Sequence, residues 1–329
     1  MFTVVVLDHS FSNLDIEREI LEPLGARVLE YQCFDPEEAA VLAADADAVL
    51  VTNGATLTGD TIARLKRCRL IVKHGIGVDI VDVAAASRQG IMVANIPDYC
   101  LEEVAEHALA LTLACARRIF EADRSIRRTL THDVVSLRPI RPIGESVFGI
   151  VGMGRIGRLT AGKLAALGGE VVFHDPFVTD DLTCGAHRFR ALTLAELCAS
   201  SDFIIVHAPY TGKNYHMLGA EAFARMRRNP WIVNVGRGEL IDNDALLAAI
   251  REGRVSGAAL DVVEGMPPLR ADDPLLICNR ILLTPHSAWY SERSLAMLQR
   301  EAANEVRRVM QGGTPRSWYN RNQMREGEA

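Results

Sequence analysis

The 329-residue chain is predicted to adopt an α/β fold with two doubly wound parallel-sheet domains, and three features support this. Short apolar strand-like segments alternate with helix-like segments almost throughout, which is typical of parallel sheets with helices on both faces. A glycine-rich turn joins a strand to a helix within residues 147–157, which indicates a nucleotide-binding unit. A last helix, expected at 292–310, is predicted to return to the first domain, which makes that domain discontinuous.

The first hundred residues are expected to form a complete open α/β unit. Strands are predicted at 3–7, 27–30, 47–51, 69–72 and 91–94, with helices at 13–22, 36–44, 59–66 and 80–88. This segment lacks a glycine-rich phosphate loop, and Pro97 and Asp98 close it. The expected extent of the first domain is 1–99 plus 288–329, and the tail from Gly312 is predicted to be poorly ordered because it is polar with glycine and proline.

The second domain is expected to span 100–287. It begins with a long apolar-striped helix at 101–119, and the segment 124–145 is predicted to be irregular. Strands are predicted at 147–151, 170–174, 203–206, 231–234, 257–260 and 281–283, with helices at 158–167, 193–198, 219–226 and 242–252.

The glycine-rich turn has the spacing G-x-G-x-x-G. Gly152 permits the tight turn, Gly154 lets the backbone approach a pyrophosphate, and Gly157 lets the helix lie close to its strand. The start of the helix then offers N–H groups and a partial positive charge to the phosphates. The three-glycine pattern is weak evidence alone, because it arises by chance at this glycine content, and the alternative is a tight strand–helix turn without a ligand.

A second strand ends in Asp175, near the offset at which an acidic residue meets the ribose hydroxyls. The alternative is a plain surface aspartate. Pro176 and Phe177 follow, and no arginine. A carboxylate there would repel a 2′-phosphate, so NAD is favoured over NADP.

Composition excludes several functions. The 36 basic and 42 acidic residues give a formal charge of −6, and the basic ones are dispersed, which argues against nucleic acid as a partner. Seven cysteines without a C-x-x-C pair argue against a disulfide framework or a zinc site, so no metal is expected and a reducing cytoplasm fits best. No apolar run is long enough to cross a membrane, and the first residues lack the pattern of a secretion signal.

In doubly wound sheets, ligands bind beyond the carboxyl ends of the strands. The residues expected at those ends are Lys73 to Gly77, His207-Ala208-Pro209, Asn234 to Gly238, Asp261, and Thr284-Pro285-His286. Taken singly, such a histidine or aspartate is more often a turn residue, and an arginine is often a surface group. Their joint occurrence beside a dinucleotide loop favours a shared cleft.

These motifs, in this order, make the chain resemble the NAD-dependent D-2-hydroxyacid dehydrogenases over nearly its whole length. The matching segments are Gly75 to Asp82, Val104 to Glu106, Gly152 to Gly157, His207 to Pro209, Asn234 to Gly238, Leu260 to Val262 and Thr284 to His286. The segments Pro97 to Cys100 and Pro285 to Glu292 look like the branch of the C-terminal-binding-protein corepressors and their bacterial relatives.

The resemblance implies two Rossmann-like domains, a substrate domain and an NAD-binding domain, and a role for each matched residue. Arg237 would hold the substrate carboxylate and carbonyl oxygen, and His286 would be the general acid/base. Asp261 would accept a hydrogen bond from the nicotinamide carboxamide. The other cofactor-binding residues would be Gly152, Gly154, Arg155, Ile156, Gly157, Asp175, His207, Ala208, Pro209 and Val235.

The substrate carboxylate would meet the backbone of Gly75, Ile76 and Gly77, and Tyr99 would also contact the substrate. Lys73 and Trp289 either line the substrate pocket or have a structural role. Five other histidines are expected to be mainly structural: His74, His107, His174, His207 and His216, of which His207 is also expected near the nicotinamide ribose. A homodimer built around residues 101–128 is expected, because a long apolar-faced helix exposes more apolar surface than a small domain leaves bare.

One position departs from the family pattern. Relatives have D-V-x-E-x-E-P, in which the second glutamate pairs with the catalytic histidine, whereas this chain places Met266 there. Glu264 matches the first acidic position, which is not the histidine's partner. Three outcomes stay open: a slow enzyme, a chemistry that needs less proton transfer, or a cofactor-binding regulatory protein that has lost catalysis. Formate or phosphite oxidation on the same fold is a further alternative to 2-keto acid reduction, because the hydride chemistry is similar.

Overall fold

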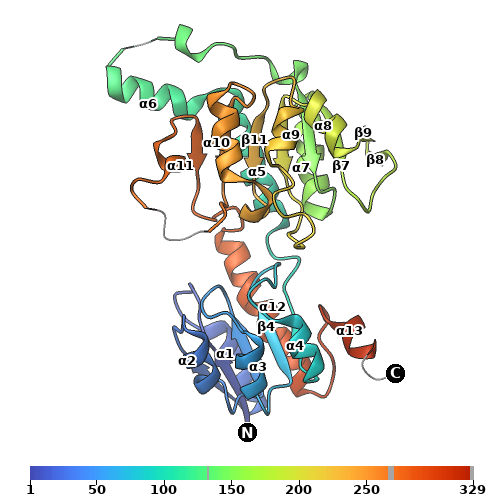
Figure 1. The fold of residues 1–329 in the computed structure, drawn as a ribbon. Helices are drawn as coiled ribbons and strands as arrows, with labels where there is room; N and C mark the ends of the chain where they lie inside the picture. The colour runs from blue at the N-terminus through green and yellow to red at the C-terminus, as the bar shows by residue number, and fades with distance from the viewer. Residues whose placement is uncertain (132, 266–269, 327–329) are drawn as a thin grey trace. The chain divides into compact units, whose positions relative to one another are not determined.

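The chain divides into two compact units (Figure 1). The computed structural model describes residues 1–329 except 132, 266–269 and 327–329. Unit 1 comprises Met1–Cys100 and Tyr290–Ala329, and unit 2 comprises Leu101–Trp289. Unit 1 is discontinuous because α12 (Glu292–Met310) packs on α1 (Asp15–Leu21) and on β4 (Leu70–Lys73).

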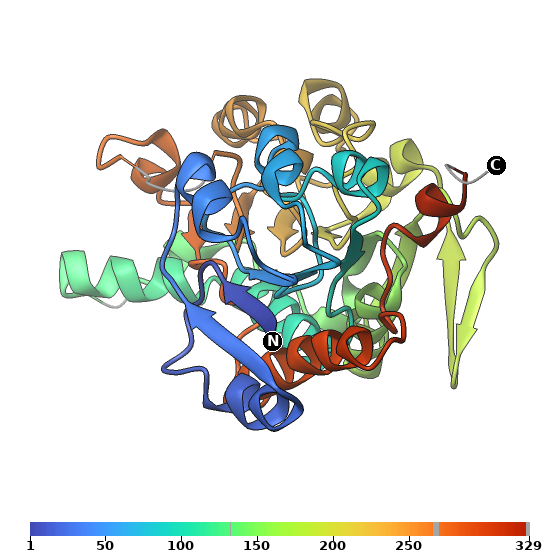
Figure 2. The ribbon, with the colours of Figure 1, turned by 90° about the horizontal axis from the view of Figure 1, so that it is seen from below.

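Unit 1 contains a five-stranded parallel sheet in the order β2-β1-β3-β4-β5. Its further elements are β1 (Phe2–Val6), β2 (Ala26–Glu30), β3 (Ala48–Val51), β5 (Met92–Ala94), α2 (Pro36–Leu42), α3 (Gly59–Arg64), α4 (Val83–Arg88) and α13 (Arg321–Glu326). Strands β3 and β4 are buried along their whole length, which explains why both are apolar apart from Lys73 at the end of β4. In Figure 2, α1 and α12 lie on one face of this sheet and α2, α3 and α4 on the other.

Unit 2 contains an eight-stranded sheet in the order β13-β12-β11-β10-β6-β7-β9-β8. Its strands are β6 (Val147–Val151), β7 (Glu170–His174), β8 (Leu182–Cys184), β9 (His187–Ala191), β10 (Phe203–Val206), β11 (Trp231–Asn234), β12 (Gly257–Leu260) and β13 (Ile281–Leu283). All neighbouring pairs are parallel except β8 and β9. The predicted fold class, two doubly wound parallel-sheet domains with the first one discontinuous, is therefore confirmed.

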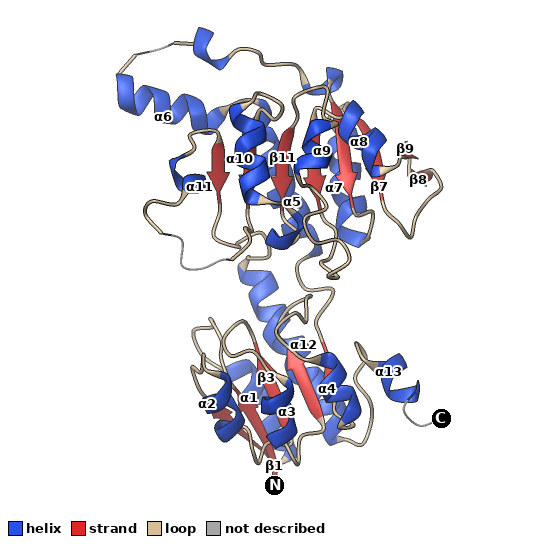
Figure 3. Ribbon diagram, in the orientation of Figure 1, coloured by secondary structure: helices blue, strands red, loops and turns tan. Residues whose placement is uncertain are grey.

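Helices cover both faces of the unit 2 sheet (Figure 3). The helices are α5 (Leu101–Ala116), α6 (Ile119–Thr129), α7 (Arg155–Ala166), α8 (Leu194–Ser200), α9 (Ala220–Ala224), α10 (Asn243–Arg251) and α11 (Pro274–Ile277). Helices α5 and α7 pack together on one face, and α8, α9 and α10 form a second group. Short 3₁₀ helices occur at Glu22–Leu24, Val135–Leu137, Ile143–Glu145 and Gly238–Leu240.

The register of the unit 2 sheet aligns the last residues of six strands. Val151 pairs with His174 on one side and with Val206 on the other. From Val206 the row continues through Asn234 and Leu260 to Leu283 at the far strand. The residues that follow these strands therefore start along one edge of the sheet. The strand order runs outward in opposite directions from β6 and β10, so the topological switch point lies between these two strands.

The helix predicted at 101–119 ends at Ala116, and a second helix, α6, follows. Arg118 has a positive φ of 51°, and its guanidinium lies over the ring of Trp231, 5.7 Å from the centroid. Phe120 is buried with its ring edge-on to the same indole. This contact with β11 turns the chain after α5, so the prediction of an irregular segment at 124–145 is wrong as far as Thr129.

Two further segments differ from expectation. Strands β8 and β9 form a hairpin that had not been predicted, and Figure 2 shows it at the rim of unit 2. The tail after Gly312 is not irregular throughout: the N–H of Val93 donates to Asn320 Oδ1 at 2.8 Å, and the N–H of Tyr319 donates to the Val93 carbonyl. Because Asn320 is buried against β5, the predicted lack of order is wrong for this part of the tail.

Candidate functional site

The glycine loop of unit 2 lies at the switch point of the sheet, where β6 stands between β7 and β10. Gly152 has a φ of 95°, and a Cβ atom there would meet the backbone nitrogen of Ala208 at 2.6 Å. A Cβ atom on Gly157 would overlap the carbonyl oxygen of Gly152. A side chain at Gly152 would therefore clash with the loop after β10. A side chain at Gly157 would clash with the turn itself, because α7 starts directly against it.

Gly154 is different, because a Cβ atom there would have no atom within 4 Å. It is the N-cap residue of the twelve-residue helix α7, and no side chain caps the helix at this position. The first-turn N–H groups and the helix dipole can therefore meet an anion at an open surface. Arg155 is exposed and Ile156 half-buried at the start of this helix, so a pyrophosphate fits the predicted place.

Asp175 follows β7 and contacts the glycine loop. Its Oδ2 accepts the N–H of Met153 at 2.7 Å, and its Oδ1 accepts the N–H of Phe177 at 2.8 Å. A carboxylate has about four acceptor positions, so each oxygen retains a position for a hydroxyl group. This geometry fits the two hydroxyls of a ribose.

The loops after β10, β11 and β12 pack against each other through glycines. A Cβ atom on Gly236 would lie 2.9 Å from the carbonyl oxygen of Ala208. A Cβ atom on Gly238 would overlap the backbone of Val263. The structure thus brings the predicted segments 207–209 and 234–238 together with residues 263–264, which follow the predicted segment 260–262. Pro209 is exposed and Val235 is buried.

Arg237 stands on a loop that a buried amide shapes. Asn234, at the end of β11, donates from Nδ2 to the Arg237 carbonyl at 2.9 Å and accepts the Gly236 N–H at its Oδ1. The guanidinium of Arg237 is half-buried and donates from Nη1 to the Gly236 carbonyl. Asn234 belonged to a matched motif but had no predicted role. The feature of the sequence that could have indicated its role is an amide side chain at the strand end, two residues before the Gly-Arg-Gly turn.

Asp261 holds the turn that follows β13. Oδ1 accepts the Ser287 N–H at 2.9 Å and the Thr284 hydroxyl, and Oδ2 accepts the Ala288 N–H at 3.0 Å. Burial alone would raise the pKa of this carboxyl, but the hydrogen bonds from His107, Thr284 and the two N–H groups outweigh burial and lower the pKa to about 2. The observed donors are protein groups, so the predicted bond to a nicotinamide carboxamide stays a prediction.

His286 lies inside this turn. Its N–H donates to the Asp261 carbonyl at 2.9 Å, and its φ of 53° is in the left-handed region that non-glycine residues rarely adopt. Trp289 ends unit 2, directly after the buried Ala288. The turn therefore fixes the backbone of the predicted proton donor next to the loops of Arg237 and Asp261.

His207 follows β10 and is half-buried, with the Nε2 atom of its imidazole shielded from solvent. Its Nε2 has no hydrogen-bond partner among the residues that the structure describes. Burial lowers the pKa of this histidine to about 4, so the ring is neutral at physiological pH. A neutral imidazole beside the glycine loop is compatible with the predicted place near the nicotinamide ribose.

Glu264 forms hydrogen bonds with two neighbours. His216 Nε2 lies 2.7 Å from Oε2, and the Tyr215 hydroxyl donates to Oε1 at 2.7 Å. Burial would raise the pKa of Glu264, but the bonds from His216 and Tyr215 lower it overall. These contacts support leaving the role of the missing catalytic glutamate unassigned. Met266 lies outside the described residues.

In unit 1, the loop after β4 presents backbone N–H groups. The carbonyls of Gly75 and Ile76 accept from the Ile96 N–H and the Asn95 side chain. Within the described ranges, no acceptor meets the N–H groups of 75–77. Lys73 is buried, and its Nζ lies 3.0 Å from where a Cβ of Gly75 would be. This loop is therefore suited to an anion. Tyr99 is buried in the turn after β5.

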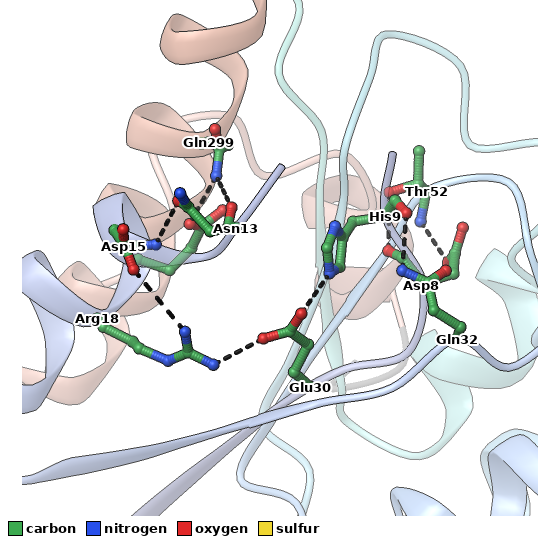
Figure 4. Close-up of polar contacts among 10 residues, drawn as sticks. Asp8, His9, Asn13, Asp15, Arg18, Glu30, Gln32, Thr52 and Gln299 are labelled. Atoms are coloured by element: carbon green, nitrogen blue, oxygen red, sulfur yellow. Dashed lines mark hydrogen bonds and ion pairs between the residues drawn. The ribbon is translucent and has the colours of Figure 1, made fainter. Parts of the chain in front are cut away.

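At the neighbouring strand ends of unit 1, the backbone N–H groups are already hydrogen-bonded to a side chain of the protein (Figure 4). The buried carboxylate of Asp8 accepts the N–H groups of 52–54, each at 2.7 Å. His9 contacts Glu30, which also binds Arg18. These N–H groups, which could otherwise hold a phosphate, are already occupied by Asp8. This agrees with the absence of a phosphate loop in the sequence.

The described part of the chain holds no group of three or more metal-ligating side chains. Among the same residues, none of the helices is long and apolar enough to cross a membrane.

Comparisons with known proteins identify the family. The model of the D-isomer specific 2-hydroxyacid dehydrogenase, NAD binding domain, matches residues 109–288. The chain is 36% identical over 268 residues to D-3-phosphoglycerate dehydrogenase of Methanocaldococcus jannaschii, covering 82% of this chain and 50% of that protein. It is 33% identical over 280 residues to glyoxylate reductase of Korarchaeum cryptofilum, covering 84% of this chain and 83% of that protein.

A structural comparison agrees. The TT0316 protein from Thermus thermophilus superposes with a TM-score of 0.84 at 28% identity, over 96% of this chain and 99% of that one. The chain spans about half the length of the phosphoglycerate dehydrogenases that it matches. The family predicted from the motifs is thus confirmed, whereas the finer branch stays a prediction. The chain belongs to the D-isomer specific 2-hydroxyacid dehydrogenase family, and NAD(H) is the cofactor of its unit 2.

Proposed function

We propose that the protein is an NAD-dependent oxidoreductase that interconverts a 2-keto acid and a D-2-hydroxy acid. The observation that supports this most is the continuous row of strand-end loops in unit 2. These loops place Arg237 and the His286 turn along the same edge as the glycine loop. In this proposal unit 2 binds the cofactor and unit 1 contributes substrate-binding groups.

The chemistry follows from the residue types. When bound, NADH supplies the hydride that reduces the keto carbon. Arg237 presents a planar cation that binds a carboxylate and polarises the adjacent carbonyl oxygen, and it stays charged at any working pH. His286 gives a proton to that oxygen during reduction and removes it in the reverse direction. His207, whose Nε2 atom is buried, stays neutral, so it adds no charge beside the cofactor.

Unit 1 is proposed to receive the substrate carboxylate on the N–H groups of Gly75, Ile76 and Gly77. The buried ammonium of Lys73 beside Gly75 supports this, because the ammonium and the N–H groups both favour an anion. Tyr99 and Trp289 are proposed to contact the substrate side chain.

The test is NADH oxidation with a panel of 2-keto acids, comparing wild type with Arg237→Ala. The variant should lose at least about 100-fold in kcat/KM, because a charge-assisted bidentate contact is removed, while NADH binding stays near normal. Arg225→Ala is a matched control, because Arg225 pairs only with the exposed Glu221 on α9 among its described contacts. A variant of Arg237 that retains most of its kcat/KM would remove this arginine from the active site.

Met266 supports a second candidate, an NAD(H)-sensing protein with weak or no catalysis, as in the corepressor branch that the sequence resembles. A thioether cannot orient an imidazole by a charged hydrogen bond or stabilise its protonated form. We favour an altered but functional enzyme because Arg237 and His286 are retained.

The substitution Met266→Glu separates these candidates. If Met266 neighbours His286, the variant should extend keto acid reduction to higher pH, because a carboxylate raises the pKa of a nearby imidazole by about one to three units. An unchanged pH–rate profile would show that the two residues are not neighbours. Absence of turnover in both proteins, with normal NADH binding, would favour the regulatory candidate.

We further propose a homodimer built around α5 and α6, acting in the cytoplasm on a small-molecule substrate without nucleic acid or membrane partners. Helix α6 projects from unit 2 (Figure 1), and the segment it begins exposes large apolar side chains. Leu130 is 86% exposed and Val134 72%, and Ile119 and Ile126 are exposed as well. Such a group of apolar side chains on one arm supports contact with a second subunit.

A further inference from the structure

His107, which was expected to be structural, contacts the turn of His286 through Thr284. His107 lies on α5, which packs against β11 and β12. Its Nε2 is 3.1 Å from the Thr284 hydroxyl oxygen and 3.4 Å from Asp261 Oδ1. The imidazole is therefore the outermost member of a polar chain that reaches the Asp261 carboxylate.

The direction of the hydrogen bonds in this chain follows from donor counts. Asp261 is ionised and can only accept, so the single hydroxyl proton of Thr284 is donated to Oδ1. The hydroxyl oxygen of Thr284 then has only acceptor positions left for His107. The Nε2 atom of His107 must consequently bear hydrogen. It reaches Asp261 through Thr284 and also faces Asp261 Oδ1 directly, at 3.4 Å.

The same carboxylate determines the backbone around His286. It accepts the N–H groups of Ser287 and Ala288, while the Asp261 carbonyl accepts the His286 N–H. His286 has a φ of 53°, a conformation that persists only when its surroundings enforce it. Any change that rotates the Asp261 carboxylate would loosen two of these N–H contacts and relax the turn.

We infer that His107 is a positioning residue for proton transfer at His286, acting through Thr284 and Asp261. This inference rests on the proposed function. It does not require contact between His107 and the substrate.

The test compares His107→Leu, which removes the donor, with His107→Gln, which retains an N–H donor of similar reach. The leucine variant should lose about tenfold in kcat for keto acid reduction, as expected when a buried acceptor loses a partner, with little change in KM. The glutamine variant should recover most of kcat. Thr284→Val and Thr284→Ser form a second pair: the valine variant should lose kcat and the serine variant should retain most of it. His187→Leu, on strand β9, is the control and should leave kcat unchanged.

Two readouts distinguish positioning from a purely structural role. The solvent deuterium isotope effect on kcat should rise in His107→Leu and return in His107→Gln, because proton transfer becomes slower when His286 is misplaced. NADH affinity should not change. Equal kcat and isotope effects for the leucine and glutamine variants, or a loss confined to thermal stability, would overturn the inference.

A third measurement separates this inference from the proposed function. The ring resonances of His286 can be followed by NMR with labelled histidine, without turnover. They should shift in His107→Leu and return towards wild type in His107→Gln. If wild type reduces no keto acid, the proposed function fails, and the NMR comparison alone decides the positioning role: shifted and rescued resonances support it, and unchanged resonances overturn it.

Discussion

Replacement of Gly154 by alanine should separate cofactor binding from folding. The backbone of Gly154, with φ −70° and ψ −163°, is accessible to alanine, and a Cβ atom would have no neighbour within 4 Å. The stability should therefore change by less than about 1 kcal/mol, the range of glycine-to-alanine effects at an N-cap. If a pyrophosphate approaches this position, however, the methyl group would displace it from the helix N–H groups.

The expected loss of NADH affinity follows from those contacts. A hydrogen bond to a charged group contributes roughly 1.5–3 kcal/mol, so the loss of one bond should raise the Kd for NADH at least about tenfold. The assay is a fluorescence titration of NADH, together with urea unfolding to confirm that the variant is folded. Wild-type affinity in a folded Gly154→Ala protein would refute the placement of the pyrophosphate on α7.

Gly157→Ala is the matched comparison, because its Cβ would overlap the Gly152 carbonyl oxygen. Relief of that overlap must move the start of α7, at a cost of about 1–3 kcal/mol. For a unit of this size, the melting temperature should fall by about 2–12 °C. Gly154→Ala should thus lower NADH affinity without a large change in stability, whereas Gly157→Ala should lower stability.

Four further predictions follow from other residues. NADH should bind at least about tenfold more tightly than NADPH, because Asp175 would face the 2′-phosphate, and similar Kd values would contradict this assignment. Light scattering should give twice the chain mass at micromolar concentration, and a Leu130→Asp, Val134→Asp double variant should move the protein towards the monomer; a monomeric wild type would refute the dimer. If Trp289 contacts the substrate, the enzyme should prefer bulky apolar or sulfur-containing 2-keto acids over pyruvate, and Trp289→Ala should change that ranking. Finally, the lowered pKa of Asp261 means that its contribution is present above pH 4 and is lost as the pH falls towards 2. The difference in unfolding free energy between wild type and Asp261→Asn should therefore shrink by about 2 kcal/mol over that range in urea titrations, and a constant difference would refute the assignment.

The fold class could be predicted because its signals are local. The last long helix was expected at 292–310 and occupies these residues, since Ser291 caps it with a capping box. The six predicted strands of unit 2 stood out as short, mostly apolar runs because both faces of the sheet are covered. By contrast, the break between α5 and α6 depends on Trp231, and the order of the tail depends on Val93. Such contacts join residues distant in sequence, so no local pattern could reveal them.

In the candidate site, too, some residues could be predicted from local sequence and others depend on long-range contacts. Glycine spacing and strand ends pointed to Gly152, Arg237 and His286, because these positions follow from the topology of a doubly wound sheet. The residues that fix their geometry, Asn234 and His107, could not be ranked from sequence. Their roles depend on which backbone groups they meet, and an amide or imidazole beside a buried apolar strand has many structural uses.

On the proposed function, this arrangement explains why a methionine at 266 would alter the chemistry more than the architecture. Arg237 is placed by Asn234, and the His286 turn by Asp261, and both of these polar groups are buried and hydrogen-bonded within unit 2. Neither placement requires a carboxylate at 266. Loss of the glutamate would therefore lower the proton affinity of His286 while leaving its backbone position unchanged. The expected consequence is a reductase active over a more acidic pH range, with substrate binding through Arg237 largely retained.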